Sequence, residues 1–238
     1  MKAQIGKPDY LPLARTVMRA NALFAACGQA TFDQLFDQGR LVHLEDGQYI
    51  QTRGQALDAL TLVITGCLAV STTAKSGKRH VIGLLEPGQI SALISLIDDK
   101  PSIHDNHAHG PTTVLCIDQQ LIRAALREQP AMLAGLMALL ASRARGLHER
   151  AVSTLLEPLS VRVAATLLRL LNAYGLPRPA GILINLKLSQ EEFASLLGTT
   201  RQRINREFSA LEKKRVISLA YSQITVTDPE QLQRLAVP

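Results

Sequence analysis

A long helical run of apolar residues, ended by a proline, is the feature that most constrains this sequence. After Pro130, apolar or small residues recur at steps of three, four and seven as far as about Leu156. A seam of this length exceeds a typical globular helix and predicts pairing with a second copy of the chain. A single helix packed on its own sheet is the alternative. The seam residues are Leu133, Leu136, Leu140, Ala144, Leu147 and Ala151.

The end of this helix divides the chain. Glu157 is followed by Pro158, and proline lacks the amide donor and disfavours helical geometry at the residue before it. We therefore predict three parts: residues 1–129, a long dimerisation helix over residues 130–157, and residues 158–238.

The part before the long helix changes character near Leu41. Residues 13–36 show apolar positions at helical spacing, whereas short β-rich runs separated by turn glycines follow as far as about Cys116. Short strands at nearly regular intervals predict an antiparallel sandwich or barrel. The expected strands are Tyr49–Gln51, Leu60–Ile64, Cys67–Ser71, His80–Leu84 and Thr113–Ile117.

Composition limits the class of protein. The 238 residues are 47% hydrophobic, which indicates a globular protein. No apolar stretch is long enough to span a membrane and no basic, apolar leader is present, so we expect a soluble cytoplasmic protein without a membrane partner. Cys27, Cys67 and Cys116 lie far apart without CxxC spacing, which indicates neither zinc nor an iron–sulfur cluster.

Positive charge gathers in the last third of the chain. Residues 1–158 hold 15 Lys/Arg and 14 Asp/Glu, a balance of +1, whereas residues 159–238 hold 11 Lys/Arg and 6 Asp/Glu, a balance of +5. Combined with a suitable motif, a basic region of this kind indicates binding to phosphate groups.

The pattern after Pro158 supplies that motif. Residues 189–192, Ser-Gln-Glu-Glu, form a capping box that begins a helix, and Gly198 makes a tight turn into a second helix. Gly175, Pro177 and Pro179 are expected in a linker. Helix, glycine turn, helix and β-hairpin in this order predict a winged helix-turn-helix. The expected elements are helices over 161–174, 189–197 and 200–214, and strands over 182–186, 216–219 and 223–227.

The second of these helices separates an apolar stripe from a basic face. Ile204, Phe208 and Leu211 are spaced by four and three, which predicts the side that packs on the domain. Arginine can donate to guanine O6 and N7, glutamine can bridge adenine N6 and N7, and free amides at a helix start suit a phosphate. An ordinary charged solvent face is the alternative. The candidate DNA-binding residues are Thr199, Thr200, Arg201, Gln202, Arg203, Asn205 and Arg206.

From about residue 20 to the C-terminus, the chain resembles the bacterial CRP/FNR superfamily, named after the cyclic-AMP receptor protein and the fumarate and nitrate reductase regulator. The segments that carry the resemblance are "LVITGCLAVSTTAKSGKRHVIGLLEPGQI" and "LSQEEFASLLGTTRQRINREFSALEKKRVI". The resemblance implies an α+β fold with an N-terminal cyclic-nucleotide-binding-like β-roll, a long dimerisation helix and a C-terminal winged helix-turn-helix. It also implies a homodimeric regulator of transcription.

The family's recognition helix commonly runs Arg-Glu-x-x-x-Arg, and here the residues are Arg201, Gln202 and Arg206. By resemblance, the two arginines contact guanines or phosphates in each half-site. A glutamate at the middle position would accept a hydrogen bond from cytosine N4. Gln202 both donates and accepts, which changes the expected base preference at that step.

The resemblance weakens at the effector site. Cyclic-AMP-responsive members carry a Gly-Glu pair that binds the ribose and an Arg-Ser or Arg-Thr pair that binds the phosphate. Counted from Gly88, these pairs fall on Ala92-Leu93 and Ile103-His104, so both charged groups are absent and a phosphate would stay unpaired. We therefore expect no ordinary cyclic-AMP binding and assign no cofactor. The N-terminal cysteine cluster of oxygen-sensing members is absent as well.

Three histidines stand where the phosphate-binding pair is expected. His104, His107 and His109 lie within "SIHDNHAHG" and are candidates for a metal site, a haem site or a pH-sensitive pocket. An exposed polar turn that leads into a strand is the alternative. A cupin-like metalloenzyme needs a further carboxylate and histidine on partner strands, and the sequence offers no clear candidates.

The sequence thus predicts a homodimeric, sequence-specific regulator that reads a near-palindromic operator through the helix over residues 200–214. Its expected partners are double-stranded DNA, a second copy of itself and, if it activates transcription, RNA polymerase. We expect no enzymatic activity. A haem- or metal-dependent sensor of the same family, using the histidine region, is the alternative function.

Overall fold

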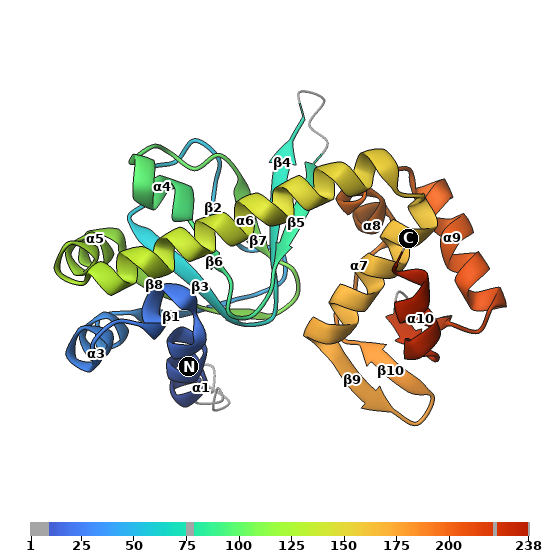
Figure 1. Cartoon of the computed structure of the whole chain (residues 1–238), viewed down its shortest axis with the longest axis horizontal. Coiled ribbons are helices and arrows are strands. Elements are labelled where there is room, and N and C mark those ends of the chain that lie inside the picture. Colours follow the sequence, from blue (N-terminus) through green and yellow to red (C-terminus); the bar gives the residue numbers. More distant parts are fainter. Residues whose placement is uncertain (1–9, 75–78, 221–222, 238) are drawn as a thin grey trace, which may run out of the picture. The chain divides into compact units, whose positions relative to one another are not determined.

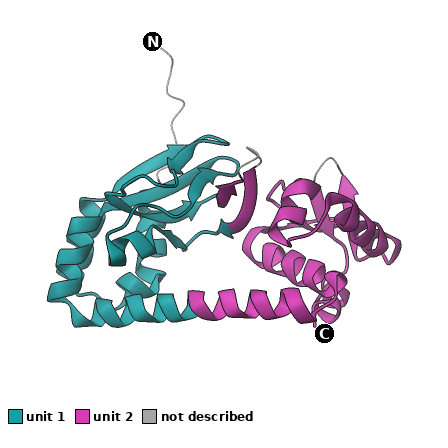
Figure 2. Ribbon diagram, turned by 90° about the horizontal axis from the view of Figure 1, so that it is seen from above, with its two compact units in different colours: residues 1–69, 84–142 teal, residues 70–83, 143–238 magenta. Residues whose placement is uncertain are grey.

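The computed structural model describes residues 10–74, 79–220 and 223–237 (Figure 1). Contacts divide the chain into two compact units, coloured in Figure 2. The first unit holds residues 1–69 and 84–142, and the second holds residues 70–83 and 143–238. The contact division therefore falls inside the long helix, whereas the boundaries at residues 129 and 157 remain a prediction from the sequence.

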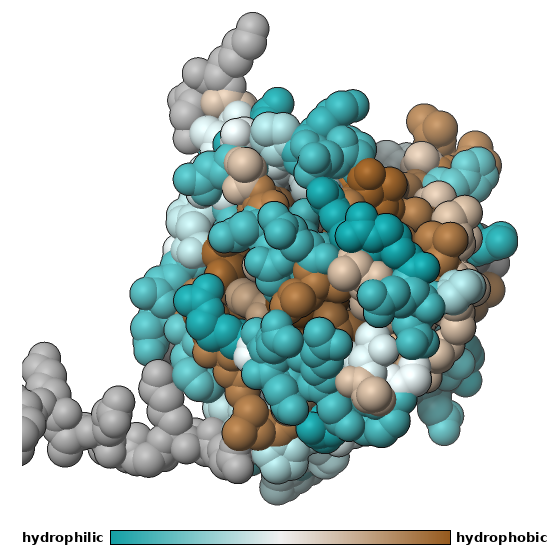
Figure 3. Space-filling view, turned by 90° about the vertical axis from the view of Figure 1, so that its left-hand side faces the viewer, coloured by the Kyte–Doolittle hydropathy of each residue, from teal (hydrophilic) through white to brown (hydrophobic). Residues whose placement is uncertain are grey.

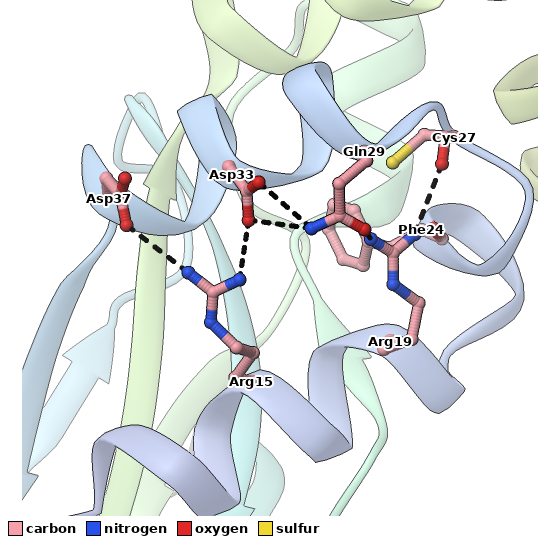
Figure 4. Close-up of polar contacts among 7 residues, drawn as sticks. All are labelled: Arg15, Arg19, Phe24, Cys27, Gln29, Asp33 and Asp37. Carbon is pink, nitrogen blue, oxygen red and sulfur yellow. Dashed lines mark hydrogen bonds and ion pairs between the residues drawn. The ribbon is translucent and has the colours of Figure 1, made fainter.

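Three short helices open the first unit: α1 (Leu11–Ala20), α2 (Ala22–Ala25) and α3 (Gln29–Asp37). Two arginines of α1 hold the helices together (Figure 4). Arg15 forms ion pairs with Asp33 and Asp37 of α3, and Arg19 donates to the carbonyl of Cys27 at 3.1 Å. Hydrogen bonds from Gln29 and Arg15 lower the pKa of Asp33 below its usual 3.8.

Two four-stranded sheets follow, which together we call the β-roll. One has the strand order β1-β8-β3-β6 and the other has the order β2-β7-β4-β5. Pairing is antiparallel in the registers of the first sheet and between β2 and β7. The strands are β1 (Arg40–Leu44), β2 (Tyr49–Gln51), β3 (Ala59–Thr65), β4 (Leu68–Thr73), β5 (Arg79–Leu85), β6 (Ile90–Ser91), β7 (Asp105–Ala108) and β8 (Thr112–Asp118).

Helices α4 (Leu93–Asp98), α5 (Gln119–Glu128) and α6 (Pro130–Leu156) complete this part of the chain. Buried side chains from α1–α3, the β-roll and the start of α6 form one hydrophobic core. At Gly135 a Cβ atom would lie 2.1 Å from the carbonyl oxygen of Ala22, so α6 approaches α2 too closely for any larger residue. This contact fixes which side of α6 faces the core.

The second unit contains helix α7 (Leu159–Tyr174) and a sheet in the order β11-β12-β10-β9. The predicted linker is wrong, because residues Gly175–Arg178 form strand β9 against β10 (Gly181–Ile184). Pro177 is tolerated because β9 lies at the sheet edge, where a missing amide donor breaks no second ladder. The remaining elements are α8 (Gln190–Leu196), α9 (Arg201–Lys213), β11 (Ile217–Ala220), β12 (Gln223–Val226) and α10 (Pro229–Leu235).

The predicted α+β class is confirmed, with an N-terminal cyclic-nucleotide-binding-like domain, a long helix and a C-terminal helix-turn-helix. Strands β1, β6 and β7 were not predicted: β6 has only two residues and β7 is a polar stretch with no alternating pattern, whereas β1 begins where the expected strands had not yet started. On the face drawn in Figure 3, hydrophobic groups lie in separate patches among hydrophilic ones. No helix in the described part of the chain is long and apolar enough to cross a membrane.

Candidate nucleic-acid interface

Helix α8 begins with the predicted capping box. The Ser189 hydroxyl accepts from the amide of Glu192 at 3.2 Å, and the Glu192 carboxylate accepts from the amide of Ser189 at 2.9 Å. Two amides at the helix start are satisfied in this way. At the other end, the guanidinium of Arg162 in α7 donates to the carbonyl of Leu197, which ties the end of α8 to the domain core.

A short turn joins α8 to α9. Gly198 adopts φ +61, the left-handed region that glycine enters without steric cost. The amide of Thr199 donates back to the carbonyl of Ala194 at 2.9 Å. The side chain of Thr200 then accepts from the amide of Arg203 at 3.3 Å and caps α9. The turn therefore fixes the direction in which α9 starts.

The apolar stripe of α9 is buried as predicted. Ile204, Phe208 and Leu211 are 0%, 2% and 7% exposed. The ring of Phe208 meets that of Phe193 in α8 edge-on, with centroids 5.1 Å apart, an arrangement that aromatic pairs prefer. This packing sets the rotation of α9 about its own axis.

The opposite side of α9 presents polar groups to solvent. Arg201, Gln202, Arg203, Asn205 and Arg206 are all exposed. The Oδ1 atom of Asn205 accepts a hydrogen bond from the side-chain amide of Gln190 in α8 at 3.3 Å, so this side chain is already oriented. The helix thus offers guanidinium and amide donors along its first turns, where the helix dipole is positive.

Two threonines at the start of α9 have different environments. Thr200 is exposed and its hydroxyl is used in the cap. The hydroxyl oxygen of Thr199 is buried and has no hydrogen-bond partner among the residues that the structure describes. Thr199 therefore lies in the turn that supports α9 rather than on its exposed face.

The β-hairpin after α9 is anchored to that helix. Arg215 turns the chain with φ +57, and its carbonyl accepts from the hydroxyl of Thr227 at 2.7 Å. The carboxylate of Glu212 accepts from the amide of Leu219 at 2.9 Å. Sequence reasoning missed the role of Glu212, since no local pattern signals a contact with a strand several residues later. The hairpin tip, residues 221–222, lies outside the described residues.

The seam on α6 divides between two environments. Leu136 is 5% exposed and belongs to the core of its own unit, and Leu140 packs against that core. Leu136 was predicted to face a partner, and the structure places it in the core instead. Met137, missed by the sequence analysis, is 60% exposed in its place, and Leu147 is 61% exposed. The exposed positions along this side of α6, at steps of four, seven, three, four and four, are Leu133, Met137, Ala144, Leu147, Ala151 and Leu155.

The three histidines do not share one environment. His107 is 4% exposed and its ring lies 5.4 Å from that of Tyr49. The Nδ1 atom of half-buried His104 has no hydrogen-bond partner within the described ranges. Burial and then the nearby charge of Arg53 lower the pKa of His104 below 6.5. Searching the described residues finds no group of three or more His, Cys, Asp or Glu that could hold a metal.

The residues at the expected effector positions are apolar. Leu93 is 1% exposed and is part of the hydrophobic core, whereas Ile103 is 48% exposed. Neither side chain can pair with a phosphate or hydrogen-bond a ribose hydroxyl.

Two known protein families match the two parts of the chain. Residues 41–129 match the cyclic nucleotide-binding domain family, and residues 161–235 match the Crp-like helix-turn-helix domain family. A β-roll domain joined by a long helix to such a domain defines a class of DNA-binding regulator. The chain belongs to the CRP/FNR superfamily of transcription regulators.

Several relatives span most of the chain. A CRP-like cAMP-activated global transcriptional regulator of Mycobacterium tuberculosis is 21% identical over 220 residues, which cover 92% of this chain and 98% of the relative. The global nitrogen regulator of Synechococcus elongatus is 27% identical over 198 residues, covering 82% and 89%. The structure of FixK2 from Bradyrhizobium japonicum matches with a TM-score of 0.73 at 17% identity, covering 84% and 98%, and shows the shared fold.

Proposed function

We propose that this protein is a homodimeric, sequence-specific regulator that reads a near-palindromic DNA operator with the exposed side of α9. The observation that carries the proposal is the division of α9. Ile204, Phe208 and Leu211 are buried, whereas Arg201, Gln202 and Arg206 are exposed. A helix held by one side and rich in guanidinium and amide donors on the other suits the major groove.

Within this interface, different residues have different tasks. Gln202 and Arg206 lie four positions apart and share one side of the helix, so we assign them to base edges. The amides at Thr200 and Arg201 lie at the positive end of α9 and suit a backbone phosphate. Thr199 supports the turn, in keeping with its buried hydroxyl. Arg203 and Asn205 flank this surface, and we assign them to the phosphates beside it.

Selection of binding sites from random duplexes tests the proposal. The purified full-length protein is expected to enrich a two-fold symmetric sequence, because each protomer contributes one α9. A protein that enriches no symmetric sequence would contradict the proposal, whereas weak retention of all sequences would indicate phosphate contacts alone.

Dimerisation is proposed through α6. The exposed stripe runs at steps of four, seven, three, four and four residues, which keeps its members on one side of the helix, as side-by-side packing of two helices requires. Leu133, Met137 and Leu147 are 49%, 60% and 61% exposed, and exposed apolar groups in such a row favour a protein partner. Ala144 lies between Met137 and Leu147, and Ala151 follows Leu147; these small side chains allow two helices to approach closely.

We further propose that DNA binding does not depend on cyclic AMP. Leu93 and Ile103 stand where the resemblance places the ribose-binding glutamate and the phosphate-binding arginine. An anionic ligand would lose its water there without gaining those partners. Isothermal titration of the protein with cyclic AMP is expected to give no saturable heat. Saturable binding at micromolar concentration would contradict this part of the proposal.

A further inference from the structure

Segment 92–102 of the first unit contains α4 and the loop that follows it. Ala92 before the helix has φ +65 and Asp99 after it has φ +56. Both are left-handed conformations in residues other than glycine, and such conformations persist only where the surroundings hold them. Three sets of contacts hold this segment in place.

One tie comes from Gln51 in β2, which is 8% exposed. Its Nε2 atom donates to the hydroxyl of Ser102. Its Oε1 atom accepts from the hydroxyl of Ser91 at 3.3 Å and from Nδ2 of Asn106 at 3.0 Å. A single amide therefore links β2, β6 and β7 to the end of the segment. Strand register explains part of this, since Gln51 lies directly opposite Asn106.

The backbone of Ser102 makes a second tie. Its amide donates to the carbonyl of Gln55 at 2.9 Å, and its carbonyl accepts from the amide of Gly54 at 2.8 Å. Ser102 is 4% exposed, so its own amide and carbonyl would be costly to leave without partners.

A third tie comes from Arg123 in α5. Its Nε atom donates to the carbonyl of Leu96 at 3.1 Å. Its Nη2 atom donates to the carbonyl of Ser95 at 3.2 Å and to the carboxylate of Asp99 at 2.8 Å. The last carbonyls of a helix lack partners within the helix. The guanidinium supplies a donor to the carbonyl of Leu96 and a second donor to that of Ser95, which also accepts from the amide of Asp99 at 3.1 Å. The end of α4 is therefore fastened to α5.

From these contacts we propose that segment 92–102 is latched closed by the protein itself, with Gln51 and Arg123 as the two positioning residues. The latch takes the place of a bound effector and leaves the β-roll in one conformation without a ligand. An entering ligand would have to break the three hydrogen bonds of the Gln51 amide. The inference concerns the first unit alone, so it can fail or hold independently of DNA reading by α9.

Hydrogen exchange of the full-length, ligand-free protein tests the latch. Amides of residues 93–102 are expected to exchange as slowly as those of neighbouring β7. Gln51→Ala and Arg123→Ala are each expected to raise exchange in the segment about tenfold, the effect of losing one or two hydrogen bonds. Exchange in β8 should stay unchanged, which separates local release of the segment from loss of the whole fold.

Two matched variants serve as controls. Gln48→Ala removes a side-chain amide. In the described residues, the only hydrogen bond of this side chain is the one it accepts from the backbone amide of Glu45 at 2.7 Å. Arg127→Ala removes an exposed guanidinium from the same helix as Arg123. Neither is expected to change exchange in residues 93–102. Fast exchange of this segment in the unaltered protein, or equal rates in the Gln51 and Gln48 variants, would overturn the latch.

A ligand arm completes the test. The Oδ1 atom of Asn106 is a buried acceptor without a partner in the described part of the chain. Because such an acceptor suits a ligand with a donor group, the exchange measurement is repeated with two compounds. One is cyclic AMP, which is an anion, and the other is adenosine, which is an uncharged donor. Neither is expected to slow exchange of residues 93–102 in the unaltered protein. Saturable protection by either compound would mean that the segment closes on a ligand, and would refute the proposal.

Discussion

At the scale of single residues, neighbours decide what each polar side chain can do. Arg162 and Arg123 donate to carbonyls at helix ends and stabilise the fold, whereas Arg201 and Arg206 face solvent on α9. The same guanidinium group is structural in one place and exposed, as the proposed DNA contact requires, in the other. Asn205 lies between these extremes, because Gln190 already engages its side-chain oxygen.

The substitution Arg206→Ala tests the assignment to a base edge. We expect a loss of about 1–3 kcal/mol in binding to the selected operator, together with relaxed preference at one base step, because one bidentate contact is removed. Binding is measured by fluorescence anisotropy on the operator and on single-base variants. Lys213→Ala, at the far end of α9, is the control. Equal loss on every sequence would assign Arg206 to a phosphate instead.

His104 gives a prediction for acid stability. Its folded pKa lies below 6.5, so between the folded pKa and 6.5 the unfolded chain binds more protons. Stability contributed by His104 is therefore present above about pH 6.5 and is lost as the pH falls through that window. The denaturant midpoint of His104→Gln should fall less than that of the unaltered protein between about pH 7.5 and about pH 5.5. Parallel declines would contradict the shift.

Helix α6 has one side in the core of its own unit and another side for which we propose a second copy of the chain. The Leu136 side packs into the core of its own unit, and Gly135 allows α2 to lie against it. The side with Met137 and Leu147 has no such cover in the described chain. The row with Leu136 and the row with Met137 both follow helical spacing. The sequence alone therefore does not distinguish the row that packs in the core from the row that stays exposed.

Leu147→Glu tests the exposed row. We expect the dimer to dissociate and operator affinity to fall with it, while the fold of the monomer is kept, because Leu147 is 61% exposed. Sedimentation and anisotropy measure the two effects. Ser142→Glu introduces the same charge on another side of α6, at an exposed residue, and should leave the dimer intact. A Leu147→Glu protein that remains dimeric would refute the seam.

For the whole molecule, the proposed function requires two copies to present two α9 helices to one duplex. The balance of +5 over residues 159–238 favours attraction to phosphates from any direction, which is not specific. Specificity then comes from symmetry, since two half-sites must lie where two linked helices can meet them.

Spacing of the operator tests this requirement. Half-site centres are expected about 34 Å, or about one helical turn, apart. Lengthening the spacer by about half a turn puts the half-sites on opposite sides of the duplex and should weaken binding at least about tenfold. The same insertion outside the half-sites is the control. Unchanged affinity with the longer spacer would indicate that single protomers bind independently.

Much of the interface could be predicted from sequence because its signals are local. The capping box at Ser189, the turn at Gly198 and the stripe of Ile204 and Phe208 are set by residues a few positions apart. The effector region was harder, because the histidines and the polar stretch of β7 give no periodic pattern. Its one clear signal was the apolar character of Leu93 and Ile103.

Local sequence patterns were therefore enough to predict the helix-turn-helix, the end of the long helix before Pro158 and the two sides of α9. These depend on backbone chemistry and helical periodicity, which act over neighbouring residues. Three features became visible only in the folded chain: Leu136 faces the core, Pro177 lies in an edge strand and Gln51 meets Ser102. Each of these depends on which distant segments pair, and that choice is made by packing and hydrogen bonding across the whole unit.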